Sequence, residues 1–472
     1  MDKTPDSILI VGSGLFGLCT AWALTERPRF DKTTITVVDN ARGQFPPTDA
    51  ASVDTSRIIR TDYSDPDYSV FGAEAQTHWR KQGDHEVGGE GRYSEVGIVI
   101  TAATPDGPPK VGTKTGMHYA RTSWENVSDI ARTSGTPGKV VELPSRKAIQ
   151  EYLGTDGNAG DWGYANMMSG WADNGAGMRW LYEKVEKTGR VNFVDAEVGE
   201  LVTKGKRVTG AKLKSGRVLE AGLVFVAAGA WTGGLIDLRG RCEATGHTLG
   251  YIGLTQEEQD KLEKHPVVLN FTTGLFFIPP RDRLLKVARH GFGYLNPKVV
   301  RRALPLSPEH ERKPIVASLP WTLRDDGVEA FAPEAEVDLR WALKNMLPIR
   351  GLEKRPWKKQ RICWYSDTRD ADWLVDWHPG WEGLFIATGD SGHGFKFLPI
   401  LGDKLVDVLE GKGGNLGEKW RWKHVDDDGL GRETGGVFKG LITEDGSRGG
   451  ALGMILADEF SKGGVALPTS KL

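Results

Sequence analysis

Several features are scarce in this chain, and each scarcity excludes a class of protein. Its 472 residues contain only three cysteines, Cys19, Cys242 and Cys363, which argues against a disulfide scaffold and for a reducing compartment. No apolar run approaches the roughly 20 residues that cross a bilayer, and residues 1–7 lack the apolar stretch of an export signal. The net charge of −2 gives no electrostatic reason to bind nucleic acid or an anionic membrane, so we expect neither partner.

The length and the pattern of apolar runs predict more than one domain. At roughly 100–200 residues per domain, the chain has room for two or three units, and 39% hydrophobic with 26% charged residues is typical of a globular protein. Buried-strand patterns occur early, midway and late, which predicts one discontinuous nucleotide-binding domain interleaved with a second domain. We expect residues 1–70, 171–245 and 355–410 in the first, 71–170 and 246–354 in the second, and 411–472 as a Gly-rich extension without a core.

The expected elements of the nucleotide-binding domain follow from hydrophobic periodicity. Short apolar runs predict parallel strands at 8–11, 35–38, 191–194, 223–227 and 384–388. Helical spacing predicts helices at 18–24, 178–187 and 396–409. Residues 201–219 read as a hairpin that turns at 214–216. The fold class is therefore α/β, or α+β across two domains, with a Rossmann-like βαβ unit at the start.

The first turn carries a GxGxxG motif, which is typical of dinucleotide sites. One glycine permits the tight turn, the next lets the backbone approach a pyrophosphate, and the last lets helix and strand pack closely. Asp39, at the end of the next strand, would accept a hydrogen bond from a ribose hydroxyl, and the helix N-terminus favours phosphate. The residues assigned to the cofactor here are Gly12, Ser13, Gly14, Leu15, Phe16, Gly17 and Asp39.

Two later segments favour FAD over NAD. Residues 226–231 resemble the second nucleotide-contact strand of FAD enzymes of the glutathione-reductase type. Residues 389–396 form a glycine loop between a strand and a helix, whose N-terminus in such a fold faces the flavin edge that becomes anionic on reduction. We assign to the cofactor from these segments Gly392, Gly394, Phe395 and Lys396.

Several ordered blocks together resemble the monomeric sarcosine oxidase and amadoriase family, which includes saccharopine and pipecolate oxidases. The blocks are the GxGxxG unit and residues 56–60, 286–290, 361–364 and 391–396, so the resemblance spans most of residues 7–410. It implies a second domain on a mostly antiparallel sheet, an amino-acid-like amine as substrate, O2 as electron acceptor and a monomer. The product of O2 reduction would be H2O2. The resemblance also implies that Ser56, Arg57 and Val198 contact the cofactor.

Cys363 stands where members of this family attach FAD through a thioether to the flavin 8α carbon. The thiolate is the nucleophile in such chemistry, and the adjacent Arg361 could favour it. Without the resemblance, a lone cysteine reads as a small buried hydrophobe. The resemblance therefore implies FAD held covalently through Cys363.

Four further residues are expected to act on substrate or O2. Arg60 and Lys396 match the pair that holds a substrate carboxylate, and a cation near a helix N-terminus, as at Lys396, is disfavoured unless an anion binds. Lys286 matches the lysine that activates O2, because a cation stabilises superoxide. His290 matches an active-site histidine of the family. Taken alone, each of these could be an ordinary structural residue.

The sequence departs from the family at two places. Where amadoriases have a glutamate for the sugar of their substrate, residues 272–277 read Thr-Thr-Gly-Leu-Phe-Phe, which argues against a fructosyl amino acid. The histidine that some sarcosine oxidases carry before the arginine motif is also absent, and Val53 or Asp54 stands there.

The expected reaction is hydride transfer from the carbon beside a neutral amine nitrogen to flavin N5. The product is an imine, and the reduced flavin is reoxidised by O2. A flavin dehydrogenase, a cyclising biosynthetic oxidase that acts on an N-methyl aromatic amino acid, an NAD-dependent dehydrogenase and a non-enzymatic nucleotide-binding module remain as alternatives. Residues 470–472, Ser-Lys-Leu, match the tripeptide that the peroxisomal import receptor reads, so we expect a peroxisomal location.

Overall fold

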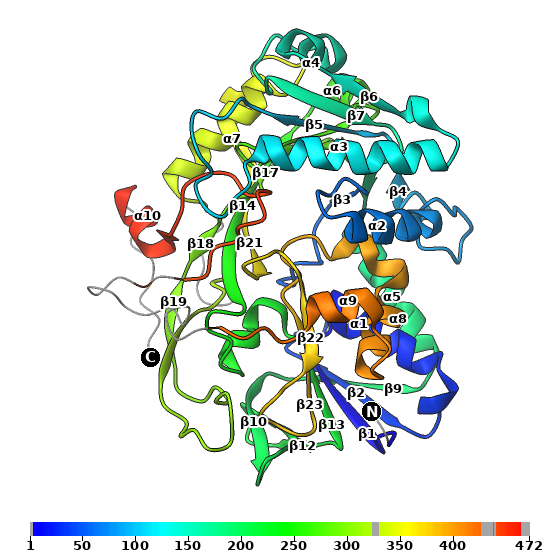
Figure 1. Cartoon of the computed structure of the whole chain (residues 1–472), viewed down its shortest axis with the longest axis vertical. Coiled ribbons are helices and arrows are strands. Elements are labelled where there is room, and N and C mark those ends of the chain that lie inside the picture. Colours follow the sequence, from blue (N-terminus) through cyan, green and yellow to red (C-terminus); the bar gives the residue numbers. More distant parts are fainter. Residues whose placement is uncertain (1–2, 323–329, 426–437, 439, 464–472) are drawn as a thin grey trace.

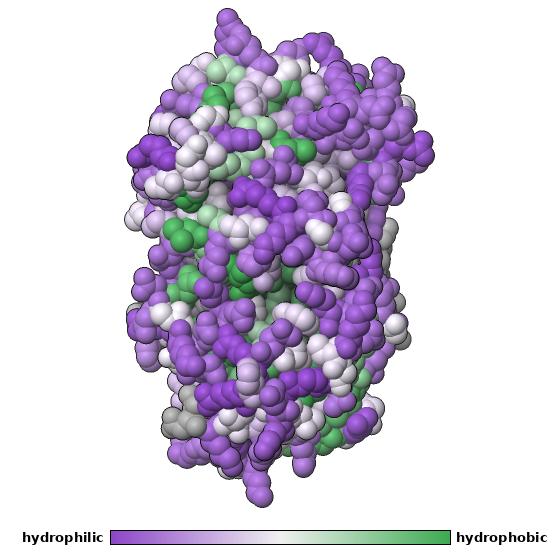
Figure 2. Space-filling view, turned by 90° about the vertical axis from the view of Figure 1, so that its right-hand side faces the viewer, coloured by the Kyte–Doolittle hydropathy of each residue, from purple (hydrophilic) through white to green (hydrophobic). Residues whose placement is uncertain are grey.

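The computed structural model describes residues 3–322, 330–425, 438 and 440–463. Figure 1 shows an elongated molecule with one sheet, around β1 and β13, at one end and a larger sheet, around β5 and β7, at the other. Long strands β14 and β21 run between them. Hydrophilic residues cover most of the face in Figure 2, and the hydrophobic residues exposed there lie in small groups. In the described part of the chain, no helix combines the length and apolar character needed to cross a membrane.

The first sheet has six strands in the order β22-β23-β13-β1-β2-β9. All neighbouring pairs are parallel except β22 with β23. This sheet matches the expected nucleotide-binding sheet, and Asp39 ends its strand β2 as predicted. The strands are β1 Ser7–Val11, β2 Thr34–Asp39, β9 Val191–Asp195, β13 Leu223–Val226, β22 Leu374–Trp377 and β23 Leu384–Thr388.

Both faces of this sheet are covered, which is why its strands are apolar throughout. Ile8 and Ile10 pack into a core with helices α1, α5 and α8, whereas the alternate residues Leu9 and Val11 pack against strands β10 and β11. The helices are α1 Leu15–Thr25, α5 Asn174–Lys187 and α8 Leu398–Leu409, and the meander is β10 Val198–Lys204, β11 Arg207–Leu213 and β12 Val218–Glu220.

The second sheet has ten strands, of which nine follow the order β24-β18-β14-β17-β16-β15-β5-β7-β6, and β21 also pairs with β14. Its pairs are antiparallel except β15 with β5 and β18 with β24, as expected for the second domain. Its strands are β5 Ile98–Ala102, β6 Val140–Leu143, β7 Trp162–Asn166, β14 Glu243–Gly253, β15 Val267–Asn270, β16 Leu275–Arg281, β17 Leu284–Arg289, β18 Tyr294–Leu295, β21 Trp357–Asp367 and β24 Met454–Ile455.

Helices cover both faces of the second sheet, and smaller elements connect the two halves. One core joins alternate strand residues to α3, and another joins the remaining ones to α4, α6 and α7. The helices are α2 Pro66–Trp79, α3 Gly116–Thr133, α4 Arg146–Leu153, α6 Gln256–Leu262, α7 Pro333–Asn345, η1 Pro28–Phe30, η2 Pro137–Lys139, η3 Gly229–Gly234, η5 Leu352–Lys354 and η6 Phe395–Phe397. The small strands are β3 Arg57–Ile59, β4 Tyr93–Ser94 and β8 Gly170–Ala172, which pair in the order β3-β8-β4, and β19 Pro297–Val300 with β20 Ile315–Ser318.

The expectation of a C-terminal extension without a core is wrong for the described residues beyond 411. Helices α9 Gly414–Trp420 and α10 Leu456–Lys462 both bury side chains. The indole of Trp420 is fully buried and stacks on Trp373 with ring centroids 4.5 Å apart. Phe460 packs into a core with β18 and β21. The high glycine content of this segment gives no apolar periodicity that predicts a core. Its large buried side chains, Trp420 and Phe460, pack against distant parts of the chain.

Most predicted elements are confirmed, with four local corrections. Helix α5 begins at Asn174, ahead of the predicted start at residue 178. The first helix begins at Leu15, inside the glycine motif. Residues 198–220 form three strands, because a second turn follows β10 in addition to the one predicted at 214–216. A 3-10 turn precedes α8, so the late α-helix begins at Leu398. The expected segment 355–410 divides between the sheets, because β21 pairs with β14; the domain boundaries themselves stay a prediction.

Candidate active site

A cavity of about 790 Å³ lies at the carboxyl ends of the parallel strands, where open α/β sheets bind nucleotides. Many of the residues predicted for the cofactor line it: Gly12, Gly14, Leu15, Phe16, Asp39, Arg57, Val198, Gly392, Gly394 and Phe395. Five others lie outside this lining: Ser13, Gly17, Ser56, Cys363 and Lys396. Tyr365 and Trp364, which follow the cysteine on β21, also line the cavity.

The glycine turn at the cavity has the geometry that a pyrophosphate needs. Gly12 has φ +107°, and a Cβ there would lie 2.4 Å from the carbonyl oxygen of Ala227. A Cβ on Gly17 would lie 1.9 Å from the carbonyl oxygen of Gly12, so this glycine allows α1 to pack against β1. Gly14 is different, because the nearest atom to its Cβ position is 3.8 Å away, on Ser52. Gly14 is half-buried at the cavity lining, and its backbone therefore leaves space for a ligand.

Asp39 is held in place by the glycine motif itself. The backbone N–H and the hydroxyl of Ser13 donate to its carboxylate at 2.7 and 2.9 Å. Ser13 thus orients the acid that was predicted to bind a ribose, although its own side chain lies behind the cavity wall. Ser52 faces the same cavity, and its buried hydroxyl has no hydrogen-bond partner among the described residues.

Cys363 is buried on β21, and Arg57 contacts it. A guanidinium nitrogen of Arg57 lies 3.5 Å from the sulfur. Arg361, which was expected to act on this thiol, instead donates to the carbonyl oxygen of Val53 at 2.6 Å. The thiol also lies 4.0 Å from the carbonyl oxygen of Ala51, a residue of the cavity wall. The predicted attachment point therefore stands beside the cavity, with a cation next to it.

Lys286 lies near the same thiol and is also buried. Its ammonium donates to the carboxylate of Asp54 at 2.6 Å and to the carbonyl oxygen of Ser56 at 2.7 Å. Burial and the neighbouring Arg57 lower the pKa of Lys286 to about 7, although Asp54 acts in the opposite direction. Ser56 was predicted to contact the cofactor, and in the structure its backbone carbonyl oxygen accepts a hydrogen bond from Lys286. In the sequence, Asp54 was noted only because Val53 or Asp54 stands where some sarcosine oxidases have a histidine.

Arg60 and Lys396 lie close together, as the sequence predicted for a carboxylate site. The Lys396 ammonium donates to the hydroxyl of Tyr63 and to the carbonyl oxygen of His393, both at 2.8 Å. The Arg60 guanidinium lies 4.5 Å from the Tyr63 ring centroid, and its Nη1 is buried without a hydrogen-bond partner among the described residues. Burial, and then the charge of Arg60, lower the pKa of Lys396 well below its usual value. A bound anion would relieve both conditions.

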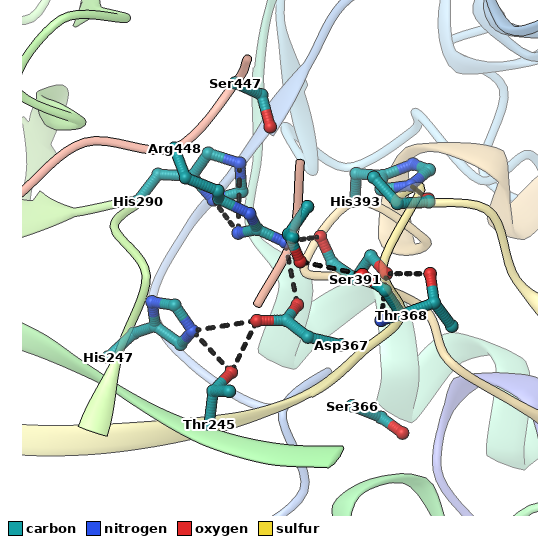
Figure 3. Close-up of polar contacts among 12 residues, drawn as sticks. Thr245, His247, His290, Ser366, Asp367, Thr368, Ser391, His393, Ser447 and Arg448 are labelled. Atoms are coloured by element: carbon teal, nitrogen blue, oxygen red, sulfur yellow. Dashed lines mark hydrogen bonds and ion pairs between the residues drawn. The ribbon is translucent and has the colours of Figure 1, made fainter. Parts of the chain in front are cut away.

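His290 contacts an arginine that the sequence analysis missed. Arg448, from the C-terminal segment, places Nη1 2.9 Å from Nδ1 of His290 and donates from Nη2 to Asp367 at 2.7 Å. Figure 3 shows its guanidinium between the imidazole and the carboxylate. Burial, and then the charge of Arg448, hold the pKa of His290 well below its usual value, so the ring is neutral. No local pattern predicts this contact, because Arg448 lies in a glycine-rich stretch.

These residues fit FAD better than a metal ion. The glycine cradle, the free space at Gly14 and the partnerless Ser52 hydroxyl suit a dinucleotide. Among the described residues, no group of three or more His, Cys, Asp or Glu side chains could hold a metal ion. The sequence comparison agrees: residues 7–408 match the family of FAD dependent oxidoreductases called DAO. The chain belongs to this family.

Three similar proteins are named as oxidases, and the match covers most of their length. The chain is 32% identical over 468 residues to the amino acid oxidase fsqB of Aspergillus fumigatus, covering 86% of this chain and 92% of that one. It is 30% identical over 459 residues to the amino acid oxidase imqH of Aspergillus flavus, covering 88% and 95%. It is 26% identical over 444 residues to the L-saccharopine oxidase of Schizosaccharomyces pombe, covering 89% and 94%.

Solved structures confirm the fold. A thermally stable mutant of a fructosyl peptide oxidase superposes with a TM-score of 0.78 at 24% identity, over 99% of each chain. The fructosyl amine oxidoreductase Amadoriase I of Aspergillus fumigatus gives 0.73 at 25% identity, over 96% of each. The predicted fold class and family are thus confirmed, and the chain is an FAD-dependent oxidoreductase. The alternatives of an NAD-dependent dehydrogenase and a non-enzymatic module do not agree with this membership.

Proposed function

We propose that this chain oxidises the C–N bond of a secondary amino acid, with an N-methyl or other N-substituent, and passes the electrons to O2. The observation that carries the proposal is the buried pair of Arg60 and Lys396, whose charges have no anionic partner at hydrogen-bond distance among the described residues. A substrate carboxylate supplies that partner and fixes the amine next to it. Relatives named amino acid oxidase and L-saccharopine oxidase support this class.

The protein residues supply binding, charge and proton control in this reaction. FAD, when bound along the glycine cradle, supplies the hydride acceptor and the site where O2 is reduced to H2O2. Arg60 and Lys396 hold the carboxylate, and Tyr63 orients the ammonium of Lys396. His290 is neutral, which avoids adding positive charge where the amine must also be neutral to react. Lys286 provides a buried cation that favours superoxide formation.

Covalent attachment of FAD through Cys363 belongs to the same proposal. The sulfur lies beside the cavity wall and 3.5 Å from a guanidinium nitrogen of Arg57. Acid precipitation tests it directly: the wild-type pellet stays yellow, and the peptide that bears Cys363 gains the mass of FAD less two hydrogens, one lost from the thiol and one from the flavin 8α carbon. A Cys363→Ser variant releases its flavin into the supernatant. A colourless wild-type pellet would exclude the bond.

An anaerobic screen tests the substrate class. Purified enzyme is mixed with N-methyl and other N-substituted amino acids, and bleaching of the flavin near 450 nm is recorded, with the matching decarboxylated amines as controls. Bleaching by a secondary amino acid and not by its decarboxylated amine is the expected result. Admission of air then yields H2O2 if O2 is the acceptor. The mass of the organic product separates a hydrolysed imine from a cyclised one.

The cellular location remains part of this proposal. Residues 470–472 lie outside the described residues, so peroxisomal import rests on the tripeptide alone. A fluorescent protein fused ahead of the chain is expected in peroxisomes, and removal of the last three residues is expected to leave it diffuse. A monomeric state is likewise a proposal, which light scattering of the purified holoenzyme tests.

A further inference from the structure

Asp54 is a buried carboxylate at the centre of a cluster of cations. It lies just ahead of β3, and its side chain is 2% exposed. It accepts the Lys286 ammonium at 2.6 Å, the guanidinium of Arg57, and the hydroxyl of Tyr251. Lys286 and Arg57 contact Oδ2, whereas Tyr251 donates to Oδ1 and Arg361 lies 4.0 Å from Oδ1. Three cations from three strands thus converge on one acid.

The cluster would not be stable without that acid. Lys286 is buried, the Arg57 side chain is 16% exposed, and the charge of Arg57 lowers the pKa of Lys286. A buried ammonium beside a second cation loses its hydration and gains repulsion, so it becomes neutral unless an anion compensates. Asp54 is the carboxylate that hydrogen-bonds to both. Its own pKa is driven well below the usual value: burial acts upward, but Lys286, Arg57 and Arg361 outweigh it.

We propose that Asp54 is a positioning residue for the reaction with O2, which keeps Lys286 charged and fixed beside Arg57 and Cys363. This inference rests on the proposed function, in which Lys286 serves O2 reduction. Asp54 acts through the lysine by charge and by a hydrogen bond, and it does not line the cavity itself. The geometry fits this role, because Lys286 is tied both to Asp54 and to the carbonyl oxygen of Ser56, the residue next to Arg57.

The test measures the two half-reactions of holoenzyme carrying Asp54→Asn. The charged and titratable groups that face Lys286 or its partner acid are Asp54, Arg57, Cys363, Tyr251 and Arg361. Removing the acid favours neutral Lys286, so reoxidation by O2 at pH 8 is expected to slow about tenfold or more. The rate of reoxidation falls as the pH rises, and in the variant this fall is expected at a pH about one unit or more lower than in the wild type. The rate of anaerobic reduction by substrate is expected to change less than about threefold, because the substitution acts on Lys286, which is proposed to serve the reaction with O2 and not substrate oxidation.

Two further variants show whether charge is the cause. Asp54→Glu keeps the negative charge. In this variant the rate of reoxidation is expected to fall over nearly the same pH range as in the wild type, and we call this fall the pH limb. Glu410→Gln removes another poorly exposed carboxylate that pairs with two arginines, Arg27 and Arg29, and is expected to change neither half-reaction. A wild-type rate and pH limb in D54N would overturn the proposal. So would a D54E limb displaced as far as that of D54N.

A double-mutant cycle gives a readout that does not depend on turnover. Unfolding midpoints are compared for D54N, Lys286→Met and the double variant, because D54N leaves the ammonium unpaired and the double variant removes it. The double variant is expected to be at least as stable as D54N, which also covers the case in which D54N alone does not fold. If the stability loss of the double variant equals the sum of the losses of the two single variants, the proposed pairing of Asp54 with Lys286 is overturned. If K286M itself reoxidises at the wild-type rate, the role of Lys286 in the proposed function fails, whatever the cycle shows about the pair.

Discussion

Arg448 donates to the carboxylate of Asp367 at 2.7 Å, although 81 residues separate them in the sequence. Both side chains are almost fully buried, at 1% and 3% exposure. Arg448 arrives on the segment just before β24, and Asp367 ends β21, the strand that carries Cys363. An ion pair therefore ties the C-terminal segment to the strand that carries Cys363, and the same arginine contacts His290.

The first prediction concerns the stability of this ion pair. Arg448→Met leaves Asp367 buried without its guanidinium, which is expected to lower the free energy of unfolding by about 3–5 kcal/mol. Urea denaturation of the holoenzyme measures it. Adding Asp367→Asn to the same variant is expected to restore part of the loss. Arg369→Met, which breaks the more exposed pair with Glu444, serves as the control and is expected to have little effect.

Local patterns predicted the parts of the site whose geometry is local. The turn at Gly12 and Gly17 follows from residue spacing, because close backbone approach there requires glycine. The contact of Lys286 with Asp54 spans 232 residues, and no periodicity reports it. Arg448 was missed for the same reason, since its partners come from distant strands. Tertiary contacts decide which buried charges are paired, so Lys286 was predicted while its counterion Asp54 was not.

The second prediction concerns the carboxylate site. Lys396→Met is expected to raise KM for a secondary amino acid roughly 10–100-fold, because a hydrogen bond to a charged group contributes about 1.5–3 kcal/mol. A smaller change in kcat is expected, since the contact exists before and during reaction. Steady-state kinetics measures both values. Lys404→Met, on the outer part of α8 beside Glu74, is the matched control. An unchanged KM would remove Lys396 from the site.

The third prediction is that carboxylate binding at this site takes up a proton. Burial and Arg60 hold the pKa of Lys396 well below its usual value in the free protein, and a bound anion raises it again. The affinity for a simple carboxylate without an amine should therefore weaken as the pH rises through the range between the two pKa values. Titration calorimetry in buffers of different ionisation heat measures the proton taken up. K396M should take up none, and equal uptake in both proteins would contradict the assignment.

The fourth prediction is a stability change with pH that comes from Glu243. Burial raises the pKa of Glu243 to about 7 from 4.5, although the backbone N–H of Ser318 donates to it at 2.6 Å. The folded protein holds this proton between those two values while the unfolded chain has released it, so stability is full below pH 4.5 and falls as the pH rises to about 7. The loss from this group is of the order of 3 kcal/mol. Glu243→Gln should flatten the plot of unfolding free energy against pH between pH 4.5 and about 7. An unchanged slope would mean that other groups cause the pH dependence.

The fifth prediction separates two glycines of the same motif, one needed for folding and one for the ligand. At Gly17 a Cβ would lie 1.9 Å from a backbone oxygen, so Gly17→Ala is expected to destabilise even the flavin-free protein, by a loss on the order of 3 kcal/mol. At Gly14 the nearest atom is 3.8 Å away and φ is −70°, so Gly14→Ala should leave unfolding of the flavin-free protein nearly unchanged. Its methyl group enters the cavity where the pyrophosphate would lie, and flavin content per chain should fall sharply. Protein made in riboflavin-starved cells gives the unfolding curves, and absorbance at 450 nm against 280 nm gives the flavin content. Full flavin content in G14A would mean that the pyrophosphate does not lie over this turn.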